Sequence, residues 1–240
     1  MTKYAAREMK RLMGKAIHNL NMTEDGDHLL VSVSGGKDSM SLLWLLRERI
    51  RRIPIEYSIT AVHVDPGFGS GSATKMRDFF IENGFNHEII ESDYGPRAHS
   101  PENLENPCFL CSRLRRKAIF KLASELNCNK VAFGHHKDDL IETFFLNIFF
   151  GASVSTLMPV QKFFEGRLTV IRPFYMIEER IIGRYAEIMG FPMVDLGCPT
   201  AGSSKREEIK KILSRLYRTN RKIKGNIFHA IQNIKSEYLP

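Results

Sequence analysis

Two cysteines separated by two residues, Cys108 and Cys111, are the side chains best suited to metal or redox chemistry. The chain has 240 residues and only four cysteines, too few for a scaffold held together by disulfides. In a reducing compartment, a C-x-x-C pair binds a metal ion or cluster, or performs thiol exchange. Cys198 is a third candidate ligand, whereas Cys128 follows a predicted helix and is interpreted as structural. An iron–sulfur cluster, a zinc ion and a redox pair stay open as alternatives.

A glycine-rich hexapeptide, SGGKDS at residues 34–39, has the composition of a phosphate-binding loop. It follows a predicted strand and begins a predicted helix, so the first helical amides point into the turn. Glycine lets the backbone approach a ligand closely, and Lys37 adds a cation. The stretch is not a Walker loop, because Val31 and Asp38 occupy positions where that motif requires other residues. We predict that residues 34–39 bind phosphate groups.

Polar residues also follow two later predicted strands. The stretch AVHVD contains His63 and ends at Asp65, and FGHHKDD occupies residues 133–139. Ligands of an open parallel sheet bind beyond the carboxyl ends of its strands, so both stretches are expected beside the phosphate loop. A lone histidine such as His63 is also commonly a satisfied core residue. Of Asp138 and Asp139, one is expected to cap the next helix and the other to hold Mg²⁺ or orient a catalytic group.

The elements that must position these residues alternate between strand and helix. This alternation predicts an α/β fold with a parallel sheet and helices on both of its faces. A polar stretch, residues 92–107, is expected to be a loop, and from Ile177 onward the pattern is helical. The predicted strands are 28–34, 57–64, 87–91, 130–133 and 168–171, and the predicted helices are 5–20, 39–50, 74–83, 110–126 and 138–149.

Changes in pattern along the chain predict three parts. Residues 1–26 form a helical arm, residues 27–175 the α/β domain, and residues 176–240 a basic helical region. No apolar run approaches the roughly 18–20 residues of a membrane span, and the N-terminus lacks the apolar middle of a secretory signal. We therefore expect a soluble, cytoplasmic protein without a membrane partner.

The charge favours a polyanionic partner such as nucleic acid, because 35 lysines and arginines face 27 acids, a net charge of +8. Charge alone is equally compatible with ordinary solvated helix faces. One basic cluster follows the C-x-x-C pair and contains Arg113, Arg115, Arg116 and Lys117. Arg113, Arg116 and Lys117 share a helix face, whereas Leu114 and Ala118 point elsewhere. A second lies at residues 205–224, and the candidates singled out there are Lys210, Arg215, Arg218 and Arg221.

Three stretches together resemble one known family. They are residues 9–39, PCFLCSRLRR at 107–116 and FGHHKDDLIETFFLNIFFG at 133–151. The hexapeptide resembles the PP-loop of ATP pyrophosphatases, and the three stretches are similar to the tRNA 2-thiocytidine synthetases, the TtcA family of that superfamily. The likeness covers nearly the whole chain. It implies a Rossmann-like fold of the HUP/PP-loop type, with an N-terminal helix and a basic helical C-terminal extension.

The resemblance also implies roles for individual residues. Cys108, Cys111 and Cys198 would hold a [4Fe–4S] cluster and leave one iron without a protein ligand. Near Cys198 this chain departs from the many family members that carry a second C-x-x-C, since it reads Cys-Pro-Thr-Ala. The implied catalytic residues are Cys108, Cys111, Asp38, Asp138 and Asp139. The implied nucleotide-binding residues are Ser34, Gly35, Gly36, Lys37, Asp38, Ser39, His63, Asp65, Gly134 and His135.

The implied activity is ATP- and Mg²⁺-dependent thiolation of tRNA, in which the C2 oxygen of a cytidine is adenylated and then replaced by sulfur. The implied partners are tRNA, bound by the basic clusters, and a sulfur donor such as a cysteine desulfurase; a homodimer is one assembly it allows. Three alternatives stay open. The first is a PP-loop enzyme with another nucleophile, as in lysidine synthetases. The second is a thiolase for another tRNA position or for a small molecule. The third is an RNA-binding protein that is stabilised by a metal and catalyses no reaction.

Overall fold

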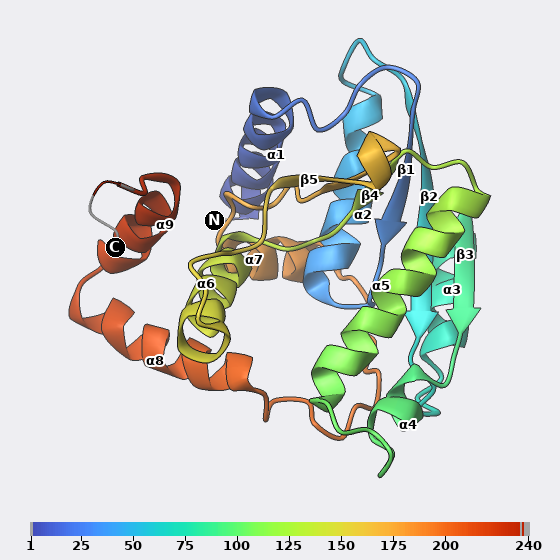
Figure 1. Ribbon diagram of the computed structural model, residues 1–240. Helices are drawn as coiled ribbons and strands as arrows, with labels where there is room; N and C mark the ends of the chain where they lie inside the picture. The colour runs from blue at the N-terminus through green and yellow to red at the C-terminus, as the bar shows by residue number, and fades with distance from the viewer. Residues whose placement is uncertain (1, 236, 238–240) are drawn as a thin grey trace. The chain divides into compact units, whose positions relative to one another are not determined.

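The structure, a computed structural model, describes residues 2–235 and 237 (Figure 1). Its strands are β1 (Asp27–Ser32), β2 (Tyr57–Asp65), β3 (His87–Glu91), β4 (Lys130–Ala132), β5 (Val160–Phe163) and β6 (Leu168–Ile171). Its helices are α1 (Thr2–Asn19), α2 (Lys37–Ile50), α3 (Ser72–Glu82), α4 (Tyr94–Ala98), α5 (Pro107–Glu125), α6 (Lys137–Gly151), α7 (Glu179–Met189), α8 (Lys205–Thr219) and α9 (Ile223–Gln232), with a short 3₁₀ helix η1 (Phe164–Gly166).

The described strands form one sheet with the order β3-β2-β1-β4-β6-β5. Neighbours from β3 to β6 run parallel, and β5 pairs antiparallel with β6 at the edge. The chain runs outward from β1 to β2 and β3, then crosses to the other side of β1 with β4. The strand order therefore reverses between β1 and β4, and ligands of such sheets bind beyond the carboxyl ends at this reversal.

The core of the sheet is built by apolar side chains that alternate between its two faces. On one face, Leu30 of β1 and Val62 of β2 pack against Ile119 and Ala123 of α5. The buried leucines of α2, such as Leu42 and Leu46, belong to the helix that follows β1 on the opposite side. Both faces of a parallel sheet must be covered, which explains why these strands are continuous apolar runs.

The sequence predicted the parallel strands and most helices within a few residues of their observed ends. Two differences concern the connections. The stretch expected to be a loop, residues 92–107, contains the short helix α4. Strand β5 was not predicted, because VQKF is short and only half-buried at the sheet edge. It pairs antiparallel with β6 and so makes the sheet mixed.

The described chain divides into two compact units by contact. Unit 1 comprises residues 1–136 and 159–199, and unit 2 comprises residues 137–158 and 200–240. Unit 1 contains the sheet with α1 to α5 and α7, and in unit 2 helix α6 packs against α8 and α9. The three parts predicted from sequence follow changes of pattern along the chain rather than this grouping. Among the described helices, none is long and apolar enough to cross a membrane.

Candidate active site

The glycine-rich stretch forms a tight turn between β1 and α2 in unit 1. Its two serines meet inside the turn, with their Oγ atoms 3.1 Å apart, and the amide of Ser34 donates to Ser39 Oγ at 3.1 Å. Ser39 Oγ in turn donates to the carbonyl oxygen of Gly36, which caps α2 without a side chain. The two hydroxyls therefore fix the loop, and the amides of the first turn of α2 face the space in front of it.

Two glycines allow neighbouring chain segments to touch this loop. Gly35 has a φ of +87°, and a Cβ built on it would lie 2.7 Å from Val194 Cβ. The Val194 amide donates to the Gly35 carbonyl at 3.2 Å, so the segment that precedes Cys198 lies against the loop. A Cβ on Gly134, after β4, would lie 3.0 Å from the backbone nitrogen of Ser39. Gly134 therefore lies beside residues 34–39, as the sequence predicted.

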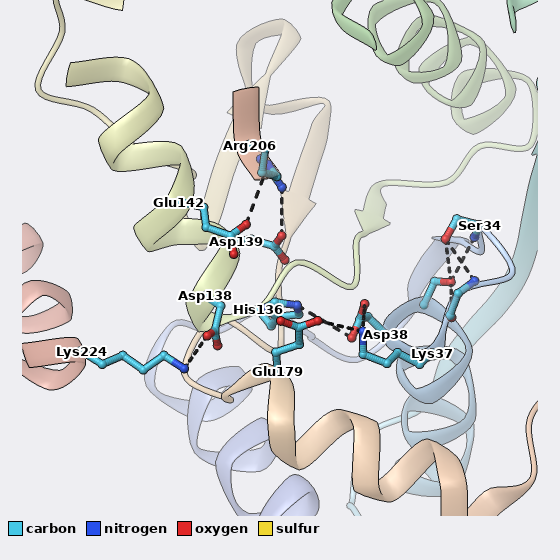
Figure 2. Close-up of polar contacts among 12 residues, drawn as sticks. Ser34, Lys37, Asp38, His136, Asp138, Asp139, Glu142, Glu179, Arg206 and Lys224 are labelled. Carbon is cyan, nitrogen blue, oxygen red and sulfur yellow. Dashed lines mark hydrogen bonds and ion pairs between the residues drawn. The ribbon is translucent and has the colours of Figure 1, made fainter. Parts of the chain in front are cut away.

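Charged groups surround the start of α2 (Figure 2). Lys37 Nζ lies 3.0 Å from Glu179 Oε1 at the start of α7 and 3.8 Å from Asp38 Oδ2. Asp38 also lies 3.8 Å from the buried His136, through Oδ1 and Nε2. The one cation that the sequence placed in the loop is thus held by a carboxylate from α7, which is 142 residues away in sequence.

His63 and Asp65 support the wall of the site from β2. His63 is fully buried, and burial lowers its pKa, so the ring is neutral and donates from Nδ1 to the Val33 carbonyl at 2.8 Å. Burial alone would raise the pKa of Asp65, but hydrogen bonds from the Gly67 amide, the Ser72 hydroxyl and a further amide bring it below its ordinary value. Both residues therefore hold the turn between β2 and α3, and His63 presents no surface to a ligand.

The C-x-x-C pair occupies the first turn of α5. The Asn106 side chain caps this helix by accepting hydrogen bonds from the amides of Cys108 and Phe109, at 3.0 and 3.3 Å. Cys108 is exposed, whereas Cys111, one turn further along, is buried. The N-cap and the proline at the helix start thus fix where the two thiols stand.

The thiols of the C-x-x-C pair and Cys198 are neighbours in unit 1. Burial raises the pKa of the Cys111 thiol, the nearby Cys198 and Cys108 thiols add to this increase, and Arg115 opposes it. Arg115 follows Cys111 by one helical turn, so the two side chains share a face, and its charge also acts on His63. Arg115 therefore lies on the inner side of α5.

The same three cysteines are the candidate ligands of a metal ion or cluster. Within residues 2–235 and 237, no three histidine, cysteine or acidic side chains are grouped closely enough to hold one metal ion. A four-iron cluster makes a different demand, because each cysteine binds a different iron and the sulfur atoms lie farther apart than around a single ion. The thiols of Cys108 and Cys198 both act electrostatically on Cys111, and three thiols are a donor set for a cluster with one open iron, whereas a closed zinc site needs a fourth ligand.

In unit 2, the carboxylates at the start of α6 are paired with the basic C-terminal helices (Figure 2). Lys224 forms an ion pair with Asp138, and Arg206 Nη1 donates to Asp139 Oδ1 at 3.0 Å. Glu142 is buried, with its Oε2 4.0 Å from Arg206 Nε. The two aspartates that the sequence predicted as catalytic thus anchor α8 and α9 onto α6.

Glu142 gives unit 2 a predicted pH dependence. Burial, with Asp139 nearby, raises the pKa of Glu142 to about 7, although Arg206 and Lys210 oppose the increase. The native state then binds a proton between pH 4.5 and 7 that the unfolded chain releases, so stability falls as pH rises through this window. We expect Glu142→Gln to abolish that fall, which reaches about 1.4 kcal/mol per pH unit at most. Thermal unfolding from pH 4.5 to 8 measures it.

The matched control for this prediction is Glu208→Gln, which removes the same charge from an exposed position on α8. Glu208→Gln should keep the fall in stability between pH 4.5 and 7. A Glu142→Gln protein with the wild-type pH dependence would show that Glu142 is ionised throughout and that Arg206 dominates its environment.

The predicted RNA-binding residues occupy different places. Arg113, Arg116 and Lys117 line a cavity beside α5. Lys210 and Arg218 line another cavity, in unit 2, together with Asp138 and Glu142. The remaining predicted members are Arg215 and Arg221, which are exposed on and after α8, and Arg115, described above.

The chain resembles known proteins in both sequence and structure. The family model for the PP-loop domain matches residues 1–195. In solved structures, the chain is similar to the U34-tRNA thiolase NcsA from Methanococcus maripaludis with its [4Fe-4S] cluster. That match has a TM-score of 0.80 and 23% identity, and covers 97% of this chain and 79% of the other. An NAD+ synthetase from Burkholderia pseudomallei matches with a TM-score of 0.53 and 18% identity, covering 98% and 91%. The fold and the glycine loop therefore define a PP-loop protein.

Curated relatives are similar over almost the whole chain. A tRNA-cytidine(32) 2-sulfurtransferase of Syntrophotalea carbinolica is 36% identical over 236 residues, which cover 97% of this chain and 91% of the relative. The protein of the same name from Methylobacillus flagellatus is 39% identical over 233 residues, covering 94% and 75%. The chain belongs to the family of tRNA-cytidine(32) 2-sulfurtransferases, and the resemblance inferred from its motifs is confirmed.

Proposed function

We propose that this protein is an ATP-dependent tRNA thiolase that replaces the C2 oxygen of a cytidine, residue 32 in the names of its relatives, by sulfur. One observation carries the proposal. In unit 1 the segment 194–198 touches the PP-loop through Val194 and ends at Cys198, whose thiol neighbours Cys111. A nucleotide loop and three thiols thus meet at one edge of a parallel sheet, as a reaction that joins ATP cleavage to sulfur transfer requires.

The PP-loop residues bind and orient ATP. The first amides of α2 and the Ser34 and Ser39 hydroxyls bind the departing pyrophosphate, and Lys37 exchanges Glu179 for phosphate oxygens. ATP is needed because the C2 oxygen of cytosine is a poor leaving group. Attack of this oxygen on the α-phosphate releases pyrophosphate and leaves the base linked to AMP, and sulfur then replaces AMP at C2.

Mg²⁺ fits this site as a companion of ATP. Proteins bind Mg²⁺ through one or two carboxylates together with substrate phosphates, without a dedicated cage of side chains. Asp38 is the carboxylate of the PP-loop and lies between Lys37 and His136. We assign to Asp38 the role of placing the metal ion or the loop itself.

Cys108, Cys111 and Cys198 would hold a [4Fe–4S] cluster. When bound, such a cluster supplies an iron without a protein ligand, at which sulfur can be carried. Helix α5 positions the first two thiols, and the segment against the PP-loop positions the third. The buried site of Cys111 keeps water away from the sulfur that reaches C2. A cysteine desulfurase is the proposed source of that sulfur in the cytoplasm, together with a reductant that brings its persulfide sulfur to the oxidation level of sulfide.

The test is an anaerobic thiolation assay. The protein is reconstituted with iron and sulfide, mixed with ATP, Mg²⁺ and an unmodified tRNA transcript, and the digested nucleosides are measured by mass spectrometry. We expect 2-thiocytidine that depends on ATP, on tRNA and on iron, with release of AMP and pyrophosphate. Thiolation by an iron-free protein would contradict the cluster, and ATP-dependent addition of an amine instead of sulfur would favour the lysidine-synthetase type of reaction.

A further inference from the structure

A cavity of about 760 Å³ lies beside α5 in unit 1, away from the PP-loop. Its described lining comes from α5 between Arg113 and Glu125, from Cys128 just after this helix, and from the β5–β6 hairpin between Phe164 and Leu168. We call it the α5–hairpin groove. The two elements lie side by side in Figure 1, where η1 forms the tip of the hairpin.

One stripe of α5 provides most of the positive charge of this groove. Arg113, Arg116, Lys117, Phe120 and Lys121 recur at intervals of three and four residues, so they share one face of the helix. The face that carries Ile119 and Ala123 is buried in the sheet core. The groove stripe is therefore distinct from the inner face, and only the stripe is available to a partner.

The hairpin adds an exposed aromatic ring. Phe164 and Glu165 have φ values of +53° and +59°, which are uncommon for residues other than glycine. The Arg167 amide and its Nε both donate to the Phe164 carbonyl at 3.2 Å, which fixes the turn. The Phe164 side chain is 55% exposed, and its ring meets Phe120 edge to face, 6.3 Å between centroids. More than half of the Phe164 side chain is therefore accessible to a partner.

We propose that the α5–hairpin groove binds unpaired nucleotides of the tRNA other than the cytidine that is thiolated, with one base stacked on Phe164 and the phosphates against the cationic stripe. This inference rests on the proposed function and adds a second contact to the tRNA. Exposed aromatic rings flanked by cations are the means by which proteins bind single-stranded nucleic acid.

The charge of the groove favours RNA as its ligand. Its lining carries the cations Arg113, Arg116, Lys117, Lys121 and Arg167 against a single acid, Glu125. Two of these cations have surface ion pairs, Arg113 with Glu105 at 2.9 Å and Lys121 with Glu125 at 3.5 Å. Such exposed pairs are weak, so phosphates replace them readily. An acidic protein would satisfy the cations, but RNA also offers planar bases for the ring.

The position of the groove separates it from the chemistry. Phe120 follows Cys111 by nine residues, which is about 14 Å along the axis of α5. A base stacked on Phe164, whose ring meets Phe120, therefore does not touch the reacting base. Its binding energy acts on tRNA affinity, so substitutions there should raise KM for tRNA and leave kcat nearly unchanged.

Fluorescence anisotropy with the full chain and an unmodified tRNA transcript tests the aromatic contact. Phe164→Asn removes the ring, and asparagine tolerates a positive φ, so the fold should be kept. We expect Kd to rise about 5- to 100-fold, the range of a lost base–aromatic stack, with an unchanged melting temperature. Phe164→Tyr should bind like the wild type, because it retains the ring.

The cationic contact is tested by the salt dependence of binding. Arg167→Ala should lower the slope of log Kd against log salt by about one, the value for one lost phosphate contact. Arg51→Ala is the matched control, because Arg51 is an exposed arginine at the end of α2, outside the groove. It should leave the slope at its wild-type value.

Wild-type affinity in Phe164→Asn, or a wild-type slope in Arg167→Ala, would overturn the proposal. A groove for the sulfur donor would be indicated if the variants kept tRNA affinity but lost thiolation driven by a cysteine desulfurase and not by sulfide. If the wild-type protein thiolates tRNA and both variants bind tRNA normally, the groove proposal is wrong and the proposed function stands. If the variants lose tRNA affinity but the wild-type protein does not thiolate tRNA, the groove proposal stands and the proposed function is wrong.

Discussion

Cys111→Ala should lower thiolation more than a hundredfold and leave ATP binding within about twofold of the wild type. Loss of residues that merely support a metal ligand already costs roughly 10- to 100-fold, so loss of a ligand should cost more. Cys111 is 9% exposed, and removing one sulfur atom from such a place costs only about 1 kcal/mol of stability. The measurements are iron and sulfide content, the anaerobic absorption spectrum, and thiolated nucleoside by mass spectrometry.

Cys128→Ala is the matched control for Cys111→Ala. Cys128 is 5% exposed in the core formed by Val131 and Leu168, and burial raises its pKa to about 11. Cys128→Ala removes a sulfur atom at a cost in stability similar to that of Cys111→Ala. The Cys128 thiol is buried in the core and therefore cannot be a ligand of the cluster. We expect full iron and sulfide content in Cys128→Ala. Equal iron in Cys111→Ala would refute its assignment as a ligand.

Gly35→Ala should destabilise the protein by about 2–5 kcal/mol and abolish ATP binding. Gly35 has a φ of +87°, in the left-handed region that costs other residues about 1–2 kcal/mol. The added Cβ would also lie 2.7 Å from Val194 Cβ, so the loop or the segment 191–198 must move. Such overpacking costs about 1–3 kcal/mol more. Thermal unfolding and ATP titration measure the two effects.

The neighbouring Gly36 is the control that separates backbone strain from the mere loss of a glycine. It has a φ of −84° and a ψ of 161°, and its Cβ would meet only Ser34 Oγ, at 3.5 Å. Gly36→Ala should therefore change stability by less than about 1 kcal/mol, even if its methyl group hinders ATP. Similar losses of stability in Gly35→Ala and Gly36→Ala would show that Val194 moves aside and that the backbone strain at residue 35 is small.

Much of the fold could be predicted from sequence because a parallel sheet leaves a strong local signal. Strands buried on both faces read as apolar runs, and β1 and β2, which are largely buried, stand out between helices of regular period. The edge strand β5 has no such signal, since Val160 and Gln161 are only half-buried. Helix α4 is a single short turn of helix inside a polar stretch, where local preference is weak.

The candidate site was predictable only in its local parts. The hexapeptide of the PP-loop and the C-x-x-C pair are each continuous in sequence, so their residues could be named. Glu179, which holds Lys37, and Val194, which packs on Gly35, could not, because each contact joins residues far apart in the chain. Helical spacing did place Arg113, Arg116 and Lys117 on one face of α5, and all three line the groove.

The contact between Val194 and Gly35 places the nucleotide loop beside a short segment that carries a candidate cluster ligand, Cys198. Val194 and Cys198 are separated by four residues, which span at most about 14 Å when fully extended. The turn at Gly197, whose amide donates to Asp195 Oδ1 at 2.9 Å, takes up part of that length. The glycine loop and the Cys198 thiol are therefore joined by a short connection, and a displacement of either would be limited by the other.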